Sequence, residues 1–364
     1  MQYGISIYPG LDNTHKENLM LLKKAAAKGF SRVFTSFHIP ETNISSFKSE
    51  LIELIQEANL LNMEIISDIS PETLKILDIP TFSPKIFKNL GIKTIRIDYG
   101  FNIDEIAKLS RNRQNIRIQL NASTITPRII DELKSAKTNF KNIDALHNFY
   151  PREGTGLSEK FFIEKTSMLQ NVGIKVGAFI PSQSKRRSPL KEGLPTLEMH
   201  RKKSVSLAAR HLAAIGIDSI IIADSLPSDN ELDVLSQVNE DCVSLSSEMI
   251  TTDVKIQKYL TSSTFSSRID EAQDAIRSQE SRQFIKNMQI SVKPDNTKAK
   301  KIGSITIDNE LYGRYMGELQ ILKCSKPAEN RTNLVAQINE SELFLLKYIT
   351  PGRNFRFVFD TKKD

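Results

Sequence analysis

The chain has 364 residues, 39% of them apolar and 26% charged, with a formal net charge of +7, values typical of a globular protein with one large domain and a smaller one. Its start, MQYGISIYPG, has no basic segment before an apolar stretch, and no run approaches 18 apolar residues, so we expect neither a signal peptide nor a transmembrane helix. Cys242 and Cys324 show no C-x-x-C spacing, which argues against a zinc ribbon or a disulfide scaffold and predicts a cytoplasmic protein with reduced thiols.

Short β-rich runs alternate with helical patterns along the first two thirds of the chain. The segments between the runs, such as residues 17–30 and 48–63, carry apolar residues at i, i+3, i+4 and i+7, the period of an amphipathic helix. Gly29, Gly91, Gly173 and Gly216 each stand just before a run, where a helix end favours glycine. The predicted strands are Gly4–Tyr8, Arg32–Phe37, Glu64–Asp68, Thr94–Tyr99, Ile116–Asn121, Ile143–Asn148, Lys175–Ile180 and Ser219–Asp224.

Eight strand–helix units in about 240 residues predict a (β/α)8 TIM barrel, an α/β fold. A doubly wound sheet is the alternative. The turn after the first strand reads YPGLDN instead of G-x-G-x-x-G, so a dinucleotide site has no support and no cofactor is expected. We therefore favour the barrel, over residues 1–245.

The texture of the sequence changes after residue 245, and we assign residues 246–364 to a smaller, β-rich domain. Residues 246–267 are polar and rich in Ser and Thr, and residues 268–282 are typical of a short helix or linker. Alternating runs then predict strands within 304–324, 331–340, 343–349 and 355–359. Asp308-Asn309 and Pro351-Gly352 are candidate hairpin turns.

Asp68 and Asp98 form the sharpest candidate pair for catalysis. They end consecutive predicted strands, and neighbouring strands lie about 4.8 Å apart, so the two carboxylates are expected to converge at the carboxyl end of the barrel. Two close carboxylates repel, which leaves one as an acid and the other as a base or a stabilising charge, the division of labour that glycosidic cleavage uses. The alternative is structural: a carboxylate that pairs with Arg96 or caps a helix.

Other polar residues gather at or just beyond the predicted strand ends, where barrels carry their active sites. Arg152 follows the sixth strand in HNFYPREGTGLS, and a guanidinium suits phosphate or carboxylate. In the seventh loop, Lys185, Arg186 and Arg187 could contribute charge, although a solvated face is the favoured interpretation. Glu198 and His200 in PTLEMH are better candidates. The remaining candidates are Tyr8, His38, Asn121, His147, Asn148, Tyr150 and Asp224.

The same residues are also compatible with other functions, some of which the sequence disfavours. A Schiff-base aldolase is disfavoured because Lys93 and Lys175 lie at strand starts. A metal-dependent sugar-phosphate isomerase or epimerase stays open, because several strands end in residues that can bind a metal: Asp68, Asp98, His147 and Asp224. No H-E-x-x-H motif supports this alternative. A non-catalytic phosphosugar sensor would keep Arg152 and survive loss of both aspartates. A nucleic-acid binder is disfavoured because Lys and Arg are spread along the chain.

Several segments, in order along essentially the whole chain, carry a family resemblance. They are GISIYP, RVFTSFHIPE, IRIDYG, QLNAST (Gln119–Thr124), HNFYPREGTGL, PTLEMHR and GRYMGELQI (Gly313–Ile321). Together they resemble the bacterial 6-phospho-N-acetylmuramidase family. The resemblance implies a TIM barrel followed by a cyclophilin-like β domain, in agreement with the partition above.

The resemblance further implies a cytoplasmic glycoside hydrolase of cell-wall (peptidoglycan) recycling. Its substrate would be a phosphorylated disaccharide, N-acetylmuramic acid 6-phosphate β-1,4-linked to N-acetylglucosamine, delivered by a phosphotransferase system. Under this hypothesis Asp68 and Asp98 flank the scissile bond, with Glu198 as a second candidate for the general acid, and the 2-acetamido group of the substrate is available as an internal nucleophile. Arg152 would take the phosphate or the lactyl carboxylate, with Arg314 reaching in from the second domain.

The expected partner is thus a small phosphorylated disaccharide, with no nucleic acid, no membrane and no metal. A homodimer stays open.

Overall fold

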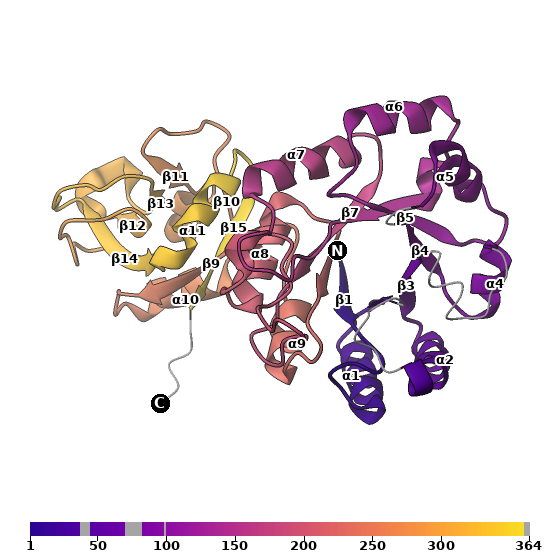
Figure 1. Ribbon diagram of the computed structural model, residues 1–364. Coiled ribbons are helices and arrows are strands. Elements are labelled where there is room, and N and C mark those ends of the chain that lie inside the picture. The colour runs from indigo at the N-terminus through magenta and orange to yellow at the C-terminus, as the bar shows by residue number, and fades with distance from the viewer. Residues whose placement is uncertain (37–43, 70–81, 98–99, 360–364) are drawn as a thin grey trace. The chain divides into compact units, whose positions relative to one another are not determined.

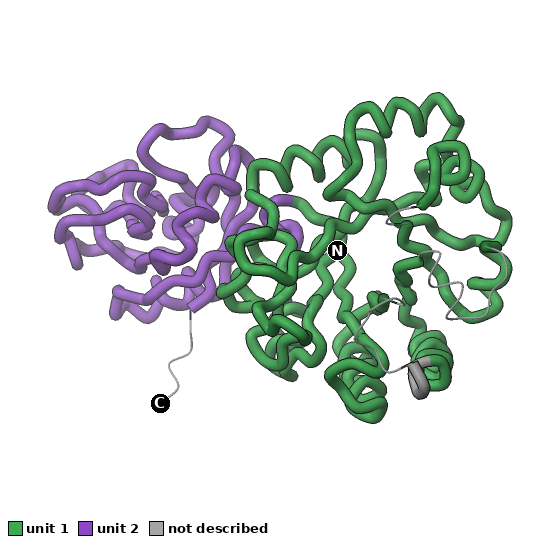
Figure 2. The backbone as a smooth tube through the Cα atoms, in the orientation of Figure 1, with its two compact units in different colours: residues 1–212, 216–238 green, residues 213–215, 239–364 purple. Residues whose placement is uncertain are grey.

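The computed structural model describes residues 1–36, 44–69, 82–97 and 100–359. The chain divides into two compact units, residues 1–212 with 216–238, and residues 213–215 with 239–364 (Figure 2). The sequence analysis placed the division at residue 245, which falls within a strand of the second unit, Cys242–Met249. Among the described residues, no helix is both long and apolar enough to cross a membrane.

The first unit is a closed barrel of eight parallel strands in sequential order, which confirms the predicted TIM barrel (Figure 1). The first strand closes the barrel by pairing with the last, Gln2 opposite Ser219. All eight predicted strands are present, with ends shifted by a few residues. They are β1 (Gln2–Ser6), β2 (Arg32–Ser36), β3 (Glu64–Ile69), β4 (Thr94–Ile97), β5 (Arg117–Asn121), β6 (Ile143–Leu146), β7 (Lys175–Ile180) and β8 (Ser219–Ile222).

Helices connect the strands along the outside of the barrel (Figure 1). The first one begins with a capping box, in which Thr14 and Glu17 satisfy each other's backbone N–H groups. It ends before Gly29, whose φ of +82° favours glycine. The helices of this unit are α1 (His15–Ala27), α2 (Ile44–Leu60), α4 (Pro84–Asn89), α5 (Ile103–Ser110), α6 (Pro127–Ser135), η1 (Phe140–Asn142), α7 (Glu159–Gln170), η2 (Glu198–His200), α8 (Val205–Ile215) and α9 (Asp229–Ser236).

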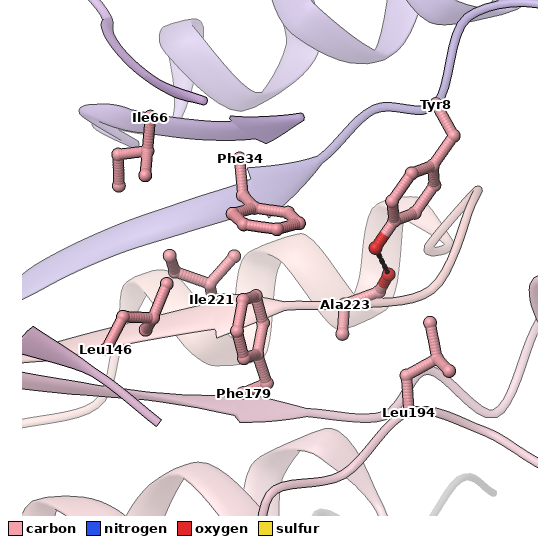
Figure 3. Close-up of a cluster of buried hydrophobic side chains, with 8 residues drawn as sticks. All are labelled: Tyr8, Phe34, Ile66, Leu146, Phe179, Leu194, Ile221 and Ala223. Carbon is pink, nitrogen blue, oxygen red and sulfur yellow. Dashed lines mark hydrogen bonds between the residues drawn. The ribbon is translucent and has the colours of Figure 1, made fainter. Parts of the chain in front are cut away.

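The interior of the barrel contains an apolar layer. Successive side chains on a strand point to opposite faces, so every second residue faces inward. Phe34 and Phe179 meet edge to face with ring centroids 5.1 Å apart (Figure 3). The buried cluster consists of Tyr8, Phe34, Ile66, Leu146, Phe179, Leu194, Ile221 and Ala223.

A polar network closes the amino-terminal end of the barrel, and on β2, β3 and β6 it lies two residues before the apolar layer. Arg32 donates to Asp144 Oδ2 at 2.6 Å and to Glu64 Oε2 at 3.1 Å. Gln119 donates to the other oxygen of Asp144 at 3.0 Å. Because the amino-terminal end of a TIM barrel contributes to stability and the active site lies at the opposite end, we assign this network to the fold.

The second unit is built on a seven-stranded mixed sheet in the order β10-β15-β9-β14-β12-β13-β11. The β-rich domain predicted for this part of the chain is therefore confirmed. β15 pairs with β9 in parallel, whereas the other pairs are antiparallel. Its elements are β9 (Cys242–Met249), α10 (Val254–Ser262), β10 (Phe265–Ser266), β11 (Ala275–Arg277), α11 (Ser281–Asn287), β12 (Ser304–Asp308), η3 (Glu310–Tyr315), β13 (Leu319–Leu322), β14 (Thr332–Ile338), η4 (Glu340–Tyr348) and β15 (Asn354–Phe359).

Two local predictions for this unit are wrong. Of the strand expected at 343–349, residues 343–348 form part of the 3-10 helix η4, because Glu342 turns inward to accept the backbone N–H of Ser246 at 2.6 Å. Asp308-Asn309 is not a two-residue hairpin turn, since Asn309 instead caps η3 by accepting the backbone N–H of Leu311 at 3.1 Å. Pro351-Gly352 is a turn, but it joins η4 to β15 and not two strands.

Candidate active site

Polar side chains from several strands reach the carboxyl-terminal end of the barrel, which we call the mouth. Asp68 lies in β3, and Asn121 ends β5. Asn148 follows β6. Each of these three residues lies two positions after an inward-facing residue of its strand (Ile66, Gln119 and Leu146), so its side chain also points inward. His38 and Asp98 lie outside the described residues. The expected approach of Asp98 to Asp68 therefore stays a prediction.

Arg96 links two of these groups inside the barrel. Its Nη1 donates to Asp68 Oδ1 at 2.7 Å, and its Nη2 donates to Asn148 Oδ1. Arg96 and Asp68 are 3% and 9% exposed, so this ion pair is shielded from water. The bond to Asn148 joins β4 to the end of β6, past the intervening strand β5. Arg96 therefore fixes the orientation of both side chains at the mouth.

The sequence predicts Arg96 only as a structural partner for a carboxylate, and the pair of Arg96 with Asp68 is present. A stronger signal was available in the run TIRI. Arginine is almost never fully buried unless it is paired, and an unpaired buried charge is costly. An arginine in the middle of a buried strand therefore predicts inward-facing acceptors on neighbouring strands.

His147 does not join the groups at the mouth. It lies between two inward-facing residues of the β6 segment, and its ring turns outward to α7, where Nε2 is 3.1 Å from Thr166 Oγ1. Its Nδ1 is 3.1 Å from Ser123 Oγ. Burial lowers the pKa of His147 to about 3, so the ring is neutral at physiological pH. The alternation of side chains along a strand explains this placement, and it assigns His147 a supporting position behind the mouth.

Ser123 connects this supporting group to the mouth. Its hydroxyl also accepts the backbone N–H of Asn148 at 3.0 Å, and its backbone N–H donates to Asn121 Oδ1 at 3.0 Å. The turn after β5 and the residues after β6 are therefore held in register. The segment QLNAST thus orders two of the predicted binding residues, Asn121 and Asn148.

Glu198 organises the loop that follows β6. Its two carboxylate oxygens accept the backbone N–H groups of Gly154 at 3.0 Å and of Gly156 at 2.7 Å. Arg201 pairs with the same carboxylate at 2.6 Å and donates to the carbonyl oxygen of Tyr150 at 3.0 Å. A Cβ atom at Gly156 would lie 2.6 Å from Glu198 Oε2. The glycine of the GTG segment is therefore required for this close approach.

This environment argues against Glu198 as a general acid. The hydrogen bond from Arg201, aided by the two backbone donors, lowers the pKa of Glu198 to about 2. A group with that pKa holds no proton to donate near neutral pH. Glu198 and Arg201 instead hold the backbone at Tyr150 and Arg152, and the Arg152 side chain is exposed.

His200 is also a buried structural group. Its Nε2 is 2.8 Å from His211 Nδ1, and His211 Nε2 is 2.9 Å from Glu159 Oε1. Burial lowers the pKa of His200 well below its ordinary value. The chain of contacts joins η2, α8 and the start of α7. It places His200 in a position that supports the loops and not among the exposed groups.

Tyr8 lies beneath the surface of the mouth. It is 2% exposed, and its hydroxyl donates to the carbonyl oxygen of Ala223 at 2.8 Å (Figure 3). Burial raises the pKa of Tyr8 to about 12. Together with Phe34, Phe149 and Phe179, whose rings meet edge to face, it forms what we call the aromatic floor.

Asp224 anchors the loop that follows β7. Its carboxylate accepts backbone N–H groups from Ser182 at 2.9 Å, Arg187 at 3.0 Å and Leu194 at 3.3 Å. Burial raises the pKa of Asp224. With three hydrogen bonds to one loop, Asp224 holds this loop in place. The sequence predicts a polar residue at this position but does not distinguish such a supporting role from substrate binding.

The interpretation of Arg187 as part of a solvated face is wrong. Its guanidinium carbon lies 4.8 Å from the ring centroid of Tyr8 and 4.9 Å from that of Phe149. The side chain therefore lies on the aromatic floor. A triplet of basic residues gives no local signal of which member turns inward, because the partners of Arg187 are distant in the sequence.

Arg314 belongs to the second unit, where it lies in η3. Its exposed guanidinium donates to the hydroxyl of Tyr315 at 2.7 Å. Its predicted contact with substrate stays a prediction. In the part of the chain that the structure describes, no three His, Cys, Asp or Glu side chains are grouped so that they could hold a metal ion.

Comparison with known proteins covers both units. The family model described as "6-phospho-N-acetylmuramidase, N-terminal" matches residues 3–237, and that described as "6-phospho-N-acetylmuramidase, C-terminal" matches residues 243–358. A solved structure of an uncharacterized B. cereus protein is 31% identical, with a TM-score of 0.87 over 98% of this chain and 99% of that chain. A conserved Enterococcus faecalis protein of unknown function is 33% identical, with a TM-score of 0.72 over 99% and 97%. No curated protein matches the sequence.

Proposed function

Because the chain belongs to the 6-phospho-N-acetylmuramidase family, a family of glycosidases, we propose that it hydrolyses the β-1,4 bond between N-acetylmuramic acid 6-phosphate and N-acetylglucosamine. The observation that carries this proposal is the family match across both units, residues 3–237 and 243–358. The products are the phosphorylated muramic acid and free N-acetylglucosamine. The reaction serves cell-wall recycling in the cytoplasm, where a phosphotransferase system delivers the substrate.

The chemistry needs a proton for the leaving oxygen and stabilisation of an oxocarbenium-like transition state. We assign these tasks to the pair Asp68 and Asp98. One aspartate orients the 2-acetamido group, whose oxygen attacks the anomeric carbon as the glycosidic C–O bond breaks, and the other protonates the leaving oxygen. Water then attacks the same carbon, reopens the ring formed by the acetamido group and returns a proton to the second aspartate. The support for Asp68 is its inward position at the mouth and its fixed orientation against Arg96. Fixed orientation of a reacting group is what lowers the entropic part of a barrier.

Substrate binding is assigned to side chains at the mouth and on its loops. Asn121, Asn148 and Tyr150 hold hydroxyl groups and the acetamido group. Arg152, which is exposed and whose backbone is bound by Arg201, takes an anionic group of the substrate. His147, His200 and Asp224 act through the residues that they position, as does Glu198.

The test is incubation of the purified chain with the phosphorylated disaccharide, with and without EDTA, and assay of free N-acetylglucosamine. We expect release that is resistant to the chelator and is lost in Asp68→Asn. Release that EDTA abolishes would favour the metal-dependent isomerase or epimerase class instead. Binding of the disaccharide without release would favour a phosphosugar sensor and would contradict the proposal.

A further inference from the structure

The basic triplet in the loop after β7 separates into three different environments. Lys185 extends to the exposed Glu17, with Nζ 3.6 Å from Oε1. Arg186 folds back on its own loop and on the chain near η2, donating to Gln183 Oε1 at 2.5 Å and to the carbonyl oxygen of Arg201 at 3.2 Å. Arg187 alone of the three lies on the aromatic floor. Two members of the triplet therefore have structural contacts that account for them, and Arg187 needs another explanation.

The backbone around Arg187 is fixed from two other segments. Its own N–H donates to Asp224 Oδ1 at 3.0 Å, and the next N–H, of Ser188, donates to Asp12 Oδ2 at 2.8 Å. Asp224 follows β8, and Asp12 lies in the loop after β1. The side chain then rests between the rings of Tyr8 and Phe149. The guanidinium is therefore held in place before any ligand binds, which lowers the entropic cost of binding.

The charge of Arg187 has no counter-ion among the described residues. In those residues no carboxylate lies within 4.0 Å of its guanidinium. Asp224 accepts the backbone N–H of Arg187 and does not pair with its side chain. The Nε of Arg187 is buried and has no hydrogen-bond partner in the same part of the chain. The two aromatic faces attract the cation, but they give its buried Nε no acceptor. An anion that reaches this position gains charge-assisted bonds in partly desolvated surroundings, where such bonds are strong.

We propose that Arg187 binds the phosphate group of the phosphosugar, an inference that rests on the proposed function. Barrels of this class frequently bind phosphate at the loops after strands seven and eight, and Arg187 lies in the loop after β7 and is anchored to the end of β8. A planar guanidinium matches phosphate oxygens in a bidentate manner. A phosphate also carries more charge than a carboxylate. Arg187 thus determines specificity for the phosphorylated sugar and leaves Arg152 for the lactyl carboxylate.

The test compares two variants of Arg187 and one control variant on three substrates. Arg187→Met removes the charge and keeps an unbranched side chain on the aromatic floor, and Arg187→Lys keeps the charge without the planar fork. Lys185→Met is the matched control, because it removes one positive charge from the same loop at an exposed position. The substrates are the phosphorylated disaccharide, its unphosphorylated counterpart and a phosphorylated counterpart without the lactyl group. The measurement is kcat/KM, with circular dichroism to confirm folding.

We expect Arg187→Met to lower kcat/KM by about 10- to 100-fold on both phosphorylated substrates, the loss typical of a hydrogen bond to a charged group. Cleavage of the unphosphorylated disaccharide, which lacks the group bound, should not change. Arg187→Lys should show a smaller loss of the same pattern, and it gives the answer if Arg187→Met does not fold. Lys185→Met should match the wild type on every substrate.

Two results would overturn the proposal. An equal loss on phosphorylated and unphosphorylated substrates would show that Arg187 does not recognise phosphate. A loss confined to substrates with the lactyl group would assign it the carboxylate.

If the wild type cleaves none of the disaccharides, the proposed function fails and calorimetric binding of N-acetylmuramic acid 6-phosphate decides the role of Arg187. Binding by the wild type that weakens in Arg187→Met supports the phosphate site. Equal binding by both proteins, or no binding by the wild type, rejects it.

Discussion

The arginines at the barrel mouth show how single residues acquire a role from their surroundings. Arg96 is buried with two acceptors and orients Asp68 and Asn148. Arg187 lies on two aromatic faces, and its buried Nε has no acceptor among the described residues. Arg201 stabilises one loop: it pairs with Glu198 and donates to the backbone carbonyl oxygen of Tyr150. The same side-chain type therefore orients a carboxylate, lies on aromatic rings or shapes a loop, depending on which acceptors lie within reach.

Asp68→Asn tests the catalytic assignment directly. We expect turnover of the phosphorylated disaccharide to fall by about 10²- to 10⁴-fold, because an amide cannot exchange a proton with the substrate or carry the stabilising charge. The amide oxygen still accepts from Arg96, so the variant should fold. Asp131→Asn is the control, since Asp131 is an exposed aspartate in α6 that pairs with Lys134. Near-normal turnover in a folded Asp68→Asn protein would reduce Asp68 to a structural partner of Arg96.

Glu198→Gln tests whether that carboxylate serves the loop. The pKa of Glu198 is lowered to about 2 in the folded chain from an ordinary value of 4.5, so its charge stabilises the fold above pH 4.5 and this contribution is lost as the pH falls to 2. Urea unfolding of wild type and variant should therefore differ at pH 7, and the difference should shrink between pH 4.5 and pH 2.

The pH dependence of turnover separates the two roles of Glu198. A general acid would make kcat of the wild type fall with rising pH as Glu198 ionises, and Glu198→Gln would remove that limb of the profile. We expect the profile of the variant to keep the shape of the wild-type profile. A changed shape together with a stability difference independent of pH would contradict the loop role.

At the scale of the elements, the inward side chains of β3 and β6 pass from a buried ionic network at one end to polar groups at the mouth. β3 begins with Glu64, which pairs with Arg32, passes through the apolar layer at Ile66 and reaches the mouth at Asp68. β6 repeats this order with Asp144 and Leu146, and Asn148 follows it. These inward residues are two positions apart because side chains alternate on a strand. Residues of odd number in the same segments, such as His147, face the helices.

Arg32→Met tests this division. It leaves the buried carboxylate of Asp144 without its cation, whereas the half-buried Glu64 keeps Arg117 at 3.9 Å. Removal of one partner of a buried ion pair costs about 3–5 kcal/mol. We expect a loss of that size in the free energy of unfolding, with kcat/KM retained at a temperature where the variant is folded. Arg128→Met, at an exposed i,i+4 pair with Glu132, should change the free energy of unfolding by less than about 1 kcal/mol. A loss of kcat/KM without a loss of stability would place the network in the catalytic machinery.

For the whole molecule, the position of β9 determines where the chain can be divided. This strand lies between β15 and β14 in the sheet of the second unit. Its residues Cys242 and Leu245 pair with Asn354 and Phe357. A fragment that begins at residue 246 loses these partners and exposes the backbone of β15, which is a template for aggregation.

We therefore expect residues 239–364 to form a folded fragment with a cooperative thermal transition, monitored by circular dichroism. Residues 246–364 should be unfolded or aggregated, because a central strand of the sheet is cut. Equal stability of the two fragments would show that the first half of β9 is dispensable and would favour the division at residue 245.

The sequence by itself determined the order of the barrel strands, the β-rich character of the second unit and the polar groups at the strand ends. These features follow from local periodicity, which repeats every two residues on a strand and every 3.6 on a helix. The same alternation, applied residue by residue, would also have turned His147 away from the mouth and Arg96 into it.

Only the tertiary structure decided which polar groups meet. Arg96 donates a hydrogen bond to Asn148, which is 52 residues away in the sequence. The side chain of Asn13 donates to the carbonyl oxygen of Ser225, which is 212 residues away. Contacts over such separations depend on how the closed barrel brings distant loops together. The η4 helix formed where an alternating run predicted a strand, because Glu342 satisfies the backbone of distant β9. Local sequence therefore sets most of the elements. Side-chain partners that are distant in the chain decide exceptions such as η4, and they decide which charged groups are paired within the fold.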